Sequence, residues 1–216
     1  MTWHRMAMVL ATSLVLGGCH VERAPSRSPH PQARDAAVYA TVLNSLYPLR
    51  ATDTTRVIAL YENTVAIQRE KAPESMWTEL YTFPGIDSTT AADLESRSTT
   101  PFVIRSVGPA LEQALAARVM FLADSDFTAL HRRVSQRTDD PVRETTDEFW
   151  KAFYQAYPAR WGSISVSAIG YRHDGGQAVL HVENGCGGLC GQGQIVLLEK
   201  VAGRWKIVRV KITFFS

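Results

Sequence analysis

The chain of 216 residues carries 23 Lys and Arg against 21 Asp and Glu, and 45% of its residues are hydrophobic. This length and apolar content suit a single domain with a sizeable core. The near-neutral charge, without a basic stripe interleaved with aromatic side chains, argues against a nucleic-acid partner.

The first residues have the pattern of a secretory signal. A short basic stretch precedes the apolar run 6–16, which is too short for a transmembrane helix. The Leu-Gly-Gly-Cys tetrapeptide at residues 16–19 resembles the lipobox of bacterial lipoproteins. We therefore predict that residues 1–18 are a lipoprotein signal peptide, and that Cys19 carries acyl chains such as palmitate and anchors the protein to a membrane. The alternative is an ordinary signal peptide that happens to contain a cysteine.

Residues 19–34 begin with this cysteine and are rich in proline and serine. Such a composition cannot bury enough apolar surface to fold, so we predict a flexible tether. His20 follows the cysteine, and in lipoproteins of Gram-negative bacteria a residue other than Asp at this place usually accompanies sorting to the outer membrane. The predicted location is the cell envelope, lipid-anchored, at the periplasmic face of the outer membrane if the host is Gram-negative.

Residues 35–216 are expected to form one α+β domain. A strand is predicted over 56–61 and another over 102–107, from their apolar and β-branched content. Residues 109–120 fit either a helix or a strand, and we divide them into a helix from Pro109 and a strand over 118–122. Ser88 is the expected N-cap of its helix. Hydrophobic spacing predicts helices over 36–46, 73–80, 88–96 and 126–133.

The C-terminal subregion 146–216 gives the clearest pattern. Aromatic side chains recur at helical spacing over residues 146–157, before Pro158 ends the helix, and we expect this stripe to pack across one face of a sheet. The sheet is a predicted four-stranded antiparallel meander, whose topology resembles cystatin-like or nuclear-transport-factor-like architecture. Its expected strands cover residues 163–171, 177–184, 194–201 and 205–214.

Between the second and third of these strands lies a glycine-rich loop with two cysteines, residues 185–193. Its five glycines make the loop entropically costly to order. A disulfide between Cys186 and Cys190 is the expected constraint, provided that the two Cα atoms approach within about 7 Å. If Cys19 carries the lipid, these two cysteines remain as an even pair in an oxidising compartment.

The loop and its flanks resemble a block in a family of uncharacterised bacterial secreted proteins and lipoproteins. The shared pattern is Cys-Gly-x-Leu-Cys-Gly-x-Gly at residues 186–193, followed by Leu-Glu-Lys at 198–200 and Gly-x-Trp-Lys at 203–206. The resemblance covers about residues 148–211. It implies an aromatic helix followed by a sheet, and the family brings no established activity.

We predict a non-catalytic envelope accessory or binding module for an unknown envelope protein or ligand. Its candidate binding loop consists of Gly187, Gly188, Leu189, Gly191 and Gly193.

The alternative is a thiol-dependent enzyme in which Cys186 or Cys190 acts as nucleophile and His181 as base. A redox pair usually has two residues between its cysteines, whereas three intervene here. No cofactor is expected, because the sequence contains no phosphate-binding or dinucleotide fingerprint. No metal site is expected either, since a structural zinc needs four ligands and the acidic pairs lack the pattern of a calcium loop.

Overall fold

The computed structural model describes residues 33–48, 57–66, 74–135, 144–159 and 161–215. Within these ranges the chain forms one seven-stranded sheet with helices on both faces, which confirms the predicted α+β class. The strands are β1 (Val57–Tyr61), β2 (Arg118–Leu122), β3 (Ser163–Val166), β4 (Gly170–Tyr171), β5 (Gln177–Gly187), β6 (Cys190–Val201) and β7 (Arg204–Phe215). The helices are α1 (Ala33–Leu46), α2 (Glu74–Tyr81), α3 (Ser88–Arg97), η1 (Ile104–Val107), α4 (Gly108–Ala114), α5 (Asp124–Ser135) and α6 (Glu144–Ala156).

The sheet has the order β2-β1-β3-β5-β6-β7, with β4 paired to β5. Strands β3, β5, β6 and β7 pair antiparallel, as the predicted meander requires. β1 adds a part that the sequence did not predict, because it pairs parallel with β2 on one side and with β3 on the other. The molecule therefore combines an antiparallel meander with a small parallel section.

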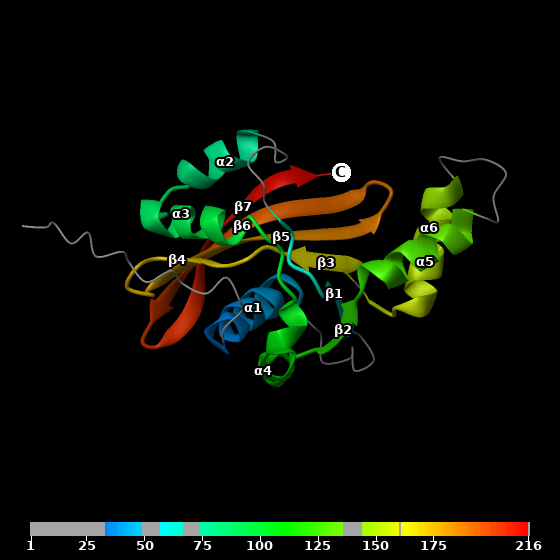
Figure 1. Cartoon of the computed structure of the whole chain (residues 1–216), viewed down its shortest axis with the longest axis horizontal. Helices are drawn as coiled ribbons and strands as arrows, with labels where there is room; N and C mark the ends of the chain where they lie inside the picture. The colour runs from blue at the N-terminus through cyan, green and yellow to red at the C-terminus, as the bar shows by residue number, and fades with distance from the viewer. Residues whose placement is uncertain (1–32, 49–56, 67–73, 136–143, 160, 216) are drawn as a thin grey trace, which may run out of the picture.

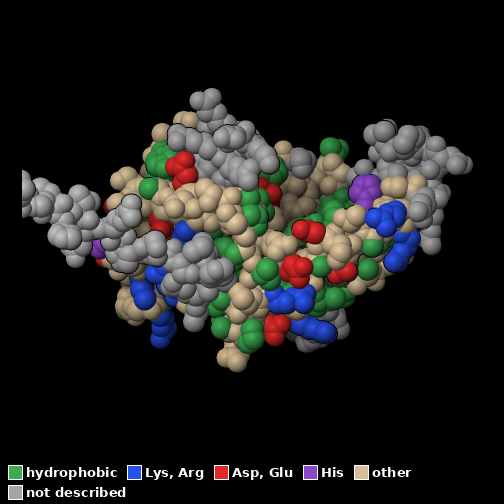
Figure 2. Space-filling view, viewed as in Figure 1, with side chains coloured by type: hydrophobic (Ala, Val, Ile, Leu, Met, Phe, Trp, Pro, Cys, Tyr) green, Lys and Arg blue, Asp and Glu red, His purple; other side chains and the backbone are tan. Residues whose placement is uncertain are grey.

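Each face of the sheet is covered by different helices (Figure 1). On one face α1, η1 and α4 bury a continuous core against side chains of β1, β3, β5 and β6. On the other face α2 and α3 cover β5 and β6, while α5 and α6 cover β1 and β2. Acidic side chains gather near the middle of the face shown in Figure 2, between α3 and α5, with basic side chains directly below them.

A buried ion pair fixes the first turn of α1 to the rest of the domain. Asp35 is fully buried and lies 3.2 Å from the guanidinium of Arg97 on α3. The hydroxyl of Tyr171 donates a 2.7 Å hydrogen bond to the same carboxylate, and Arg97 also donates to the carbonyl oxygen of Ile169. Because α1 begins at Ala33, the last two residues of the predicted tether belong to this helix.

The predicted strand 163–171 is divided into β3 and β4. The backbone carbonyl of Ser167 accepts a hydrogen bond from Tyr39, and that of Ile169 accepts one from Arg97. The hydroxyl of Ser167 accepts the backbone N–H of His181, a contact that replaces part of the regular strand pairing. Side chains from both helical layers thus compete with the sheet for this segment.

Three other local predictions were wrong. Of the predicted strand 102–107, only Val103 makes a β-bridge, to Asn63, and Ile104–Val107 form η1, with Ile104 and Val107 buried on one side of its turn. The N-cap of α3 is Asp87, whose carboxylate accepts the N–H of Thr89 at 2.8 Å, and not Ser88. The aromatic helix α6 packs with α5 over β1 and β2 and reaches the meander only at the end of β5, where Tyr154 contacts Cys186, instead of lying across the meander.

Candidate functional site

The two-cysteine loop is the end of a long hairpin rather than a separate loop. β5 and β6 continue their pairing through it, so that Gly185 lies opposite Gly191 and Gly187 opposite Cys190. A β-bulge accommodates Cys186 between the paired glycines. We refer to residues 185–193 in this arrangement as the hairpin end.

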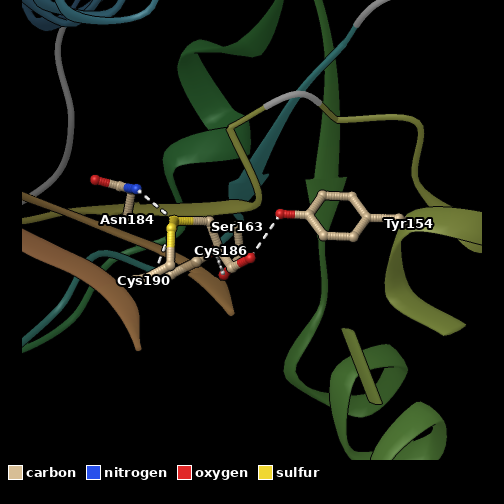
Figure 3. The surroundings of a disulfide bond; sticks show 6 residues. Tyr154, Ser163, Asn184, Cys186 and Cys190 are labelled. Atoms are coloured by element: carbon tan, nitrogen blue, oxygen red, sulfur yellow. Dashed lines mark hydrogen bonds between the residues drawn. A yellow bond between two sulfur atoms is a disulfide. The ribbon is translucent and has the colours of Figure 1, made fainter. Parts of the chain in front are cut away.

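The structure places the sulfur atoms of Cys186 and Cys190 at disulfide distance, with 5.0 Å between the two Cα atoms (Figure 3). Tyr154 of α6 points toward this crosslink and donates a 2.9 Å hydrogen bond to the backbone carbonyl of Cys186. The side-chain amide of Asn184 faces the Cys186 sulfur at 3.6 Å. The side chain of Leu189 is 94% exposed. The crosslinked hairpin end is therefore held from one side and presents one bare apolar side chain to solvent.

Two glycines have steric roles at this end of the sheet. A Cβ on Gly162, whose φ is +73°, would lie 2.0 Å from the carbonyl oxygen of Gly185. A Cβ on Gly193 would lie 2.2 Å from the ring of Phe214 and 2.7 Å from the hydroxyl oxygen of Thr213. The absence of side chains here lets β3 and β7 approach the hairpin closely.

His181 is 3% exposed, is hydrogen-bonded to Thr213 of β7 and contacts Glu183 of its own strand β5. Its Nε2 is 3.2 Å from the hydroxyl oxygen of Thr213, and its Nδ1 is 3.3 Å from a carboxylate oxygen of Glu183. Burial lowers the pKa of His181 to about 4, and burial also raises the pKa of Glu183. The imidazole is consequently neutral at neutral pH, and Gly193 provides the space in which Thr213 reaches it.

This geometry bears on the thiol-enzyme alternative. Both ring nitrogens of His181 are engaged by Thr213 and Glu183, while Cys186 and Cys190 are bonded to each other. A hydroxyl, an imidazole and a carboxylate in series resemble a nucleophile, its base and an orienting group. However, a base with a pKa of about 4 is poorly matched to proton abstraction near neutral pH. The contact between His181 and Thr213 links β5 to β7 across β6.

A second site lies where the parallel strands end, and the sequence did not point to it. A cavity of about 340 Å³ opens there on the face that carries α5 and α6; we call it the strand-end cavity. It is lined by Tyr61, Asn63, Thr64, Val65, Pro101, Asp124 and Ser165. All of them except Pro101, which lies between α3 and η1, come from β1 and β3 or from the segments that follow β1 and β2.

The polar groups of this cavity are mostly neutral. The amide of Asn63 donates to the carboxylate of Asp124 at 3.4 Å. Burial raises the pKa of Tyr61, whose hydroxyl is hydrogen-bonded with Ser163. Asp124, at the start of α5, is the one charged residue among the described residues of the lining. The missed signal was the polar residue that follows each of two adjacent strands, Asn63 after β1 and Asp124 after β2.

Cys19, the predicted lipidation site, lies outside the described residues. Among the residues that the structure describes, no helix is long and apolar enough to cross a membrane. The same part of the chain contains no group of three or more His, Cys, Asp or Glu side chains placed to hold a metal ion.

The fold and these two sites define an α+β domain with a mixed sheet, a crosslinked hairpin and a small polar cavity. Comparison with protein-family models, curated proteins and solved structures finds no match to this chain.

Proposed function

We propose that this protein is a lipid-anchored component of the bacterial cell envelope and that its domain is a non-catalytic binding module. The hairpin end is the proposed contact surface for an envelope partner. The observation that carries this proposal is the exposed Leu189 on a crosslinked turn whose base is held by Tyr154. A preorganised apolar tip loses little conformational entropy when it binds.

The position of the hairpin end supports contact with a partner that lies away from the proposed lipid anchor. α1 begins beside Tyr171, which pairs with Ala178 near the start of β5, and Gly187 ends the same strand. At about 3.3 Å per residue, this part of β5 spans roughly 30 Å. The start of α1 and the hairpin end therefore lie toward opposite ends of this strand (Figure 1).

Lipid anchoring is tested separately from binding. Cells that express the full chain are grown with radiolabelled palmitate, with the Cys19→Ser variant as the matched control. The proposal predicts label on the native protein, retention in the membrane fraction, and loss of both in the variant. Label on the Cys19→Ser chain, or an unlabelled native chain, would contradict it.

The binding role is tested by photocrosslinking in intact cells. A photoreactive amino acid replaces Leu189 in one variant and the exposed Lys206, at the other end of the sheet, in the control. We expect a discrete adduct from position 189 that is absent from position 206 and is lost when Cys186 and Cys190 are both replaced by Ser. No adduct from position 189, or identical adducts from both positions, would overturn the hairpin end as the contact surface.

The thiol-enzyme alternative is separated from the binding module by the redox state of the cysteines in cells. The protein is trapped with an alkylating agent without reductant, and the peptide that contains Cys186 and Cys190 is weighed. The binding-module proposal requires an unalkylated peptide lighter by two hydrogens than the dithiol form. Two alkylated thiols would favour the enzyme.

A further inference from the structure

We propose that the strand-end cavity binds a neutral sugar unit. This inference is independent of the hairpin end, because it concerns a different surface and a ligand of different size. It is carried by the size of the cavity, its place in the sheet and the chemistry of its lining.

The cavity lies where ligands bind in open sheets with parallel strands. β1 pairs parallel with β2 and with β3, so the carboxyl ends of all three strands meet at one edge. After β1 the chain reaches β2 on one side, and after β2 it returns to β3 on the other side of β1. Such a reversal of strand order leaves a crevice outside the strand ends, and this is the general location of ligand sites in open α/β sheets.

The volume of about 340 Å³ is near the lower end of the range for small-molecule sites. It suits one or two sugar rings rather than a large cofactor. Val65 and Pro101 supply apolar surface for the C–H groups of such a ring, while Ser165 and Thr64 supply hydroxyl groups within the same lining.

The lining has the donors and acceptors that a polyol requires. The carboxylate of Asp124 accepts one hydrogen bond from the amide of Asn63 and retains further acceptor positions for ligand hydroxyls. The amide of Asn63 is fixed by this contact. Hydroxyl groups of the ligand both donate and accept, so they match a lining that mixes a carboxylate, an amide and hydroxyls.

Charge makes an anionic ligand unsuitable. Among the residues that the structure describes, the lining contains Asp124 and no Lys, Arg or His, and Glu183 is the cross-strand neighbour of Ser165. The nearby guanidinium of Arg105 is 3.2 Å from the carboxylate of Glu62. In this part of the structure a phosphate would therefore meet negative charge, without a cation among the described lining residues to bind it. Among the same described residues an amine would find one carboxylate and no aromatic cage, since the ring of Tyr61 packs against Phe127 with 5.5 Å between the ring centroids.

The test uses the full-length protein in a zwitterionic detergent that has no sugar head group. Saturation-transfer NMR is recorded with glucose, N-acetylglucosamine and its β-1,4-linked disaccharide, and separately with inorganic phosphate and putrescine. We expect signal transfer from the protein to at least one of the three saccharides and none to phosphate or putrescine. Binding of phosphate or putrescine alone, or of none of these probes, would overturn the proposal.

Variants locate the binding. Asp124→Asn keeps the shape of the side chain and removes its charge, so we expect at least about tenfold weaker saccharide binding, typical of a lost hydrogen bond to a charged group. Ser165→Ala should weaken binding several-fold. The matched control is Asp126→Asn, on the same turn of α5 but outside the cavity lining, and it should bind like the native protein. Unchanged binding in both cavity variants, with native thermal unfolding, would show that the saccharide binds elsewhere.

Discussion

The buried imidazole of His181 predicts a specific dependence of stability on pH. Its pKa falls from the ordinary 6.5 to about 4 in the folded protein because burial disfavours the charged form. Between these values the unfolded chain binds a proton that the folded chain does not bind. The stability that His181 contributes is therefore fully present above pH 6.5 and is lost as the pH falls toward 4. The pKa difference corresponds to about 3 kcal/mol.

Two other charged groups lie near the imidazole, and one of them, Glu183, reduces the loss of stability in acid. Glu183 faces Nδ1, and because burial raises its pKa, the folded state holds the Glu183 proton more tightly in acid and offsets part of the loss. Lys211 occupies the neighbouring register position on β7 and lies 3.9 Å from Glu79. A variant that changes the imidazole alone is needed to isolate its contribution.

The measurement is urea unfolding of the full chain from pH 7.5 to pH 4, followed by tryptophan fluorescence. The difference in free energy of unfolding between the native protein and His181→Gln should shrink by about 3 kcal/mol over this range. His173→Gln, in the turn between β4 and β5, is the matched control for the replacement of a histidine by glutamine. Parallel pH curves for native protein and His181→Gln would refute the reasoning.

Three variants, one of them a double substitution, test other parts of the fold, each by urea unfolding of the full chain. Gly170→Ala should lower the free energy of unfolding by about 2 to 3 kcal/mol, because the new Cβ would lie 2.4 Å from a carbonyl oxygen of α3. An unchanged free energy of unfolding would mean that α3 can move away from β4 without loss of stability. Replacing Cys186 and Cys190 by Ser should cost about 2 kcal/mol, and reduction of the native protein should cost the same; a difference between the two would mean that serine itself perturbs the turn. Arg97→Met should cost about 3 kcal/mol, because it removes a buried cation from Asp35, and a cost below about 1 kcal/mol would refute the importance of this pair.

Local pattern was sufficient to predict most of the regular structure. In β6 the consecutive apolar residues 195–198 predicted a strand covered on both faces, and all four side chains are buried between β5 and β7. The division at residues 109–120 was also correct, since α4 contains Pro109 in its first turn and β2 begins at Arg118. These segments bury their apolar side chains in the way that their own periodicity dictates.

Predictions failed where a distant partner decided the local structure. Residues 163–171 have the composition of one strand. Two backbone carbonyl groups of this segment nevertheless accept hydrogen bonds from the side chains of Tyr39 and Arg97. The apolar pair Ile104 and Val107 fits a strand equally well as a turn, and packing against α1 and α4 selects the turn. Competing contacts of this kind come from segments that lie far away in the sequence.

The same reason explains why the strand-end cavity was missed while the hairpin end was recognised. The hairpin end is contiguous in sequence, so its glycines and cysteines form a visible motif. The cavity gathers Asn63, Asp124 and Ser165 from three separate segments, and they meet only because β1 pairs parallel with both β2 and β3. The predicted antiparallel meander alone does not specify where β1 and β2 pair with the sheet. The parallel section of the sheet thus creates a site that no single stretch of the sequence contains.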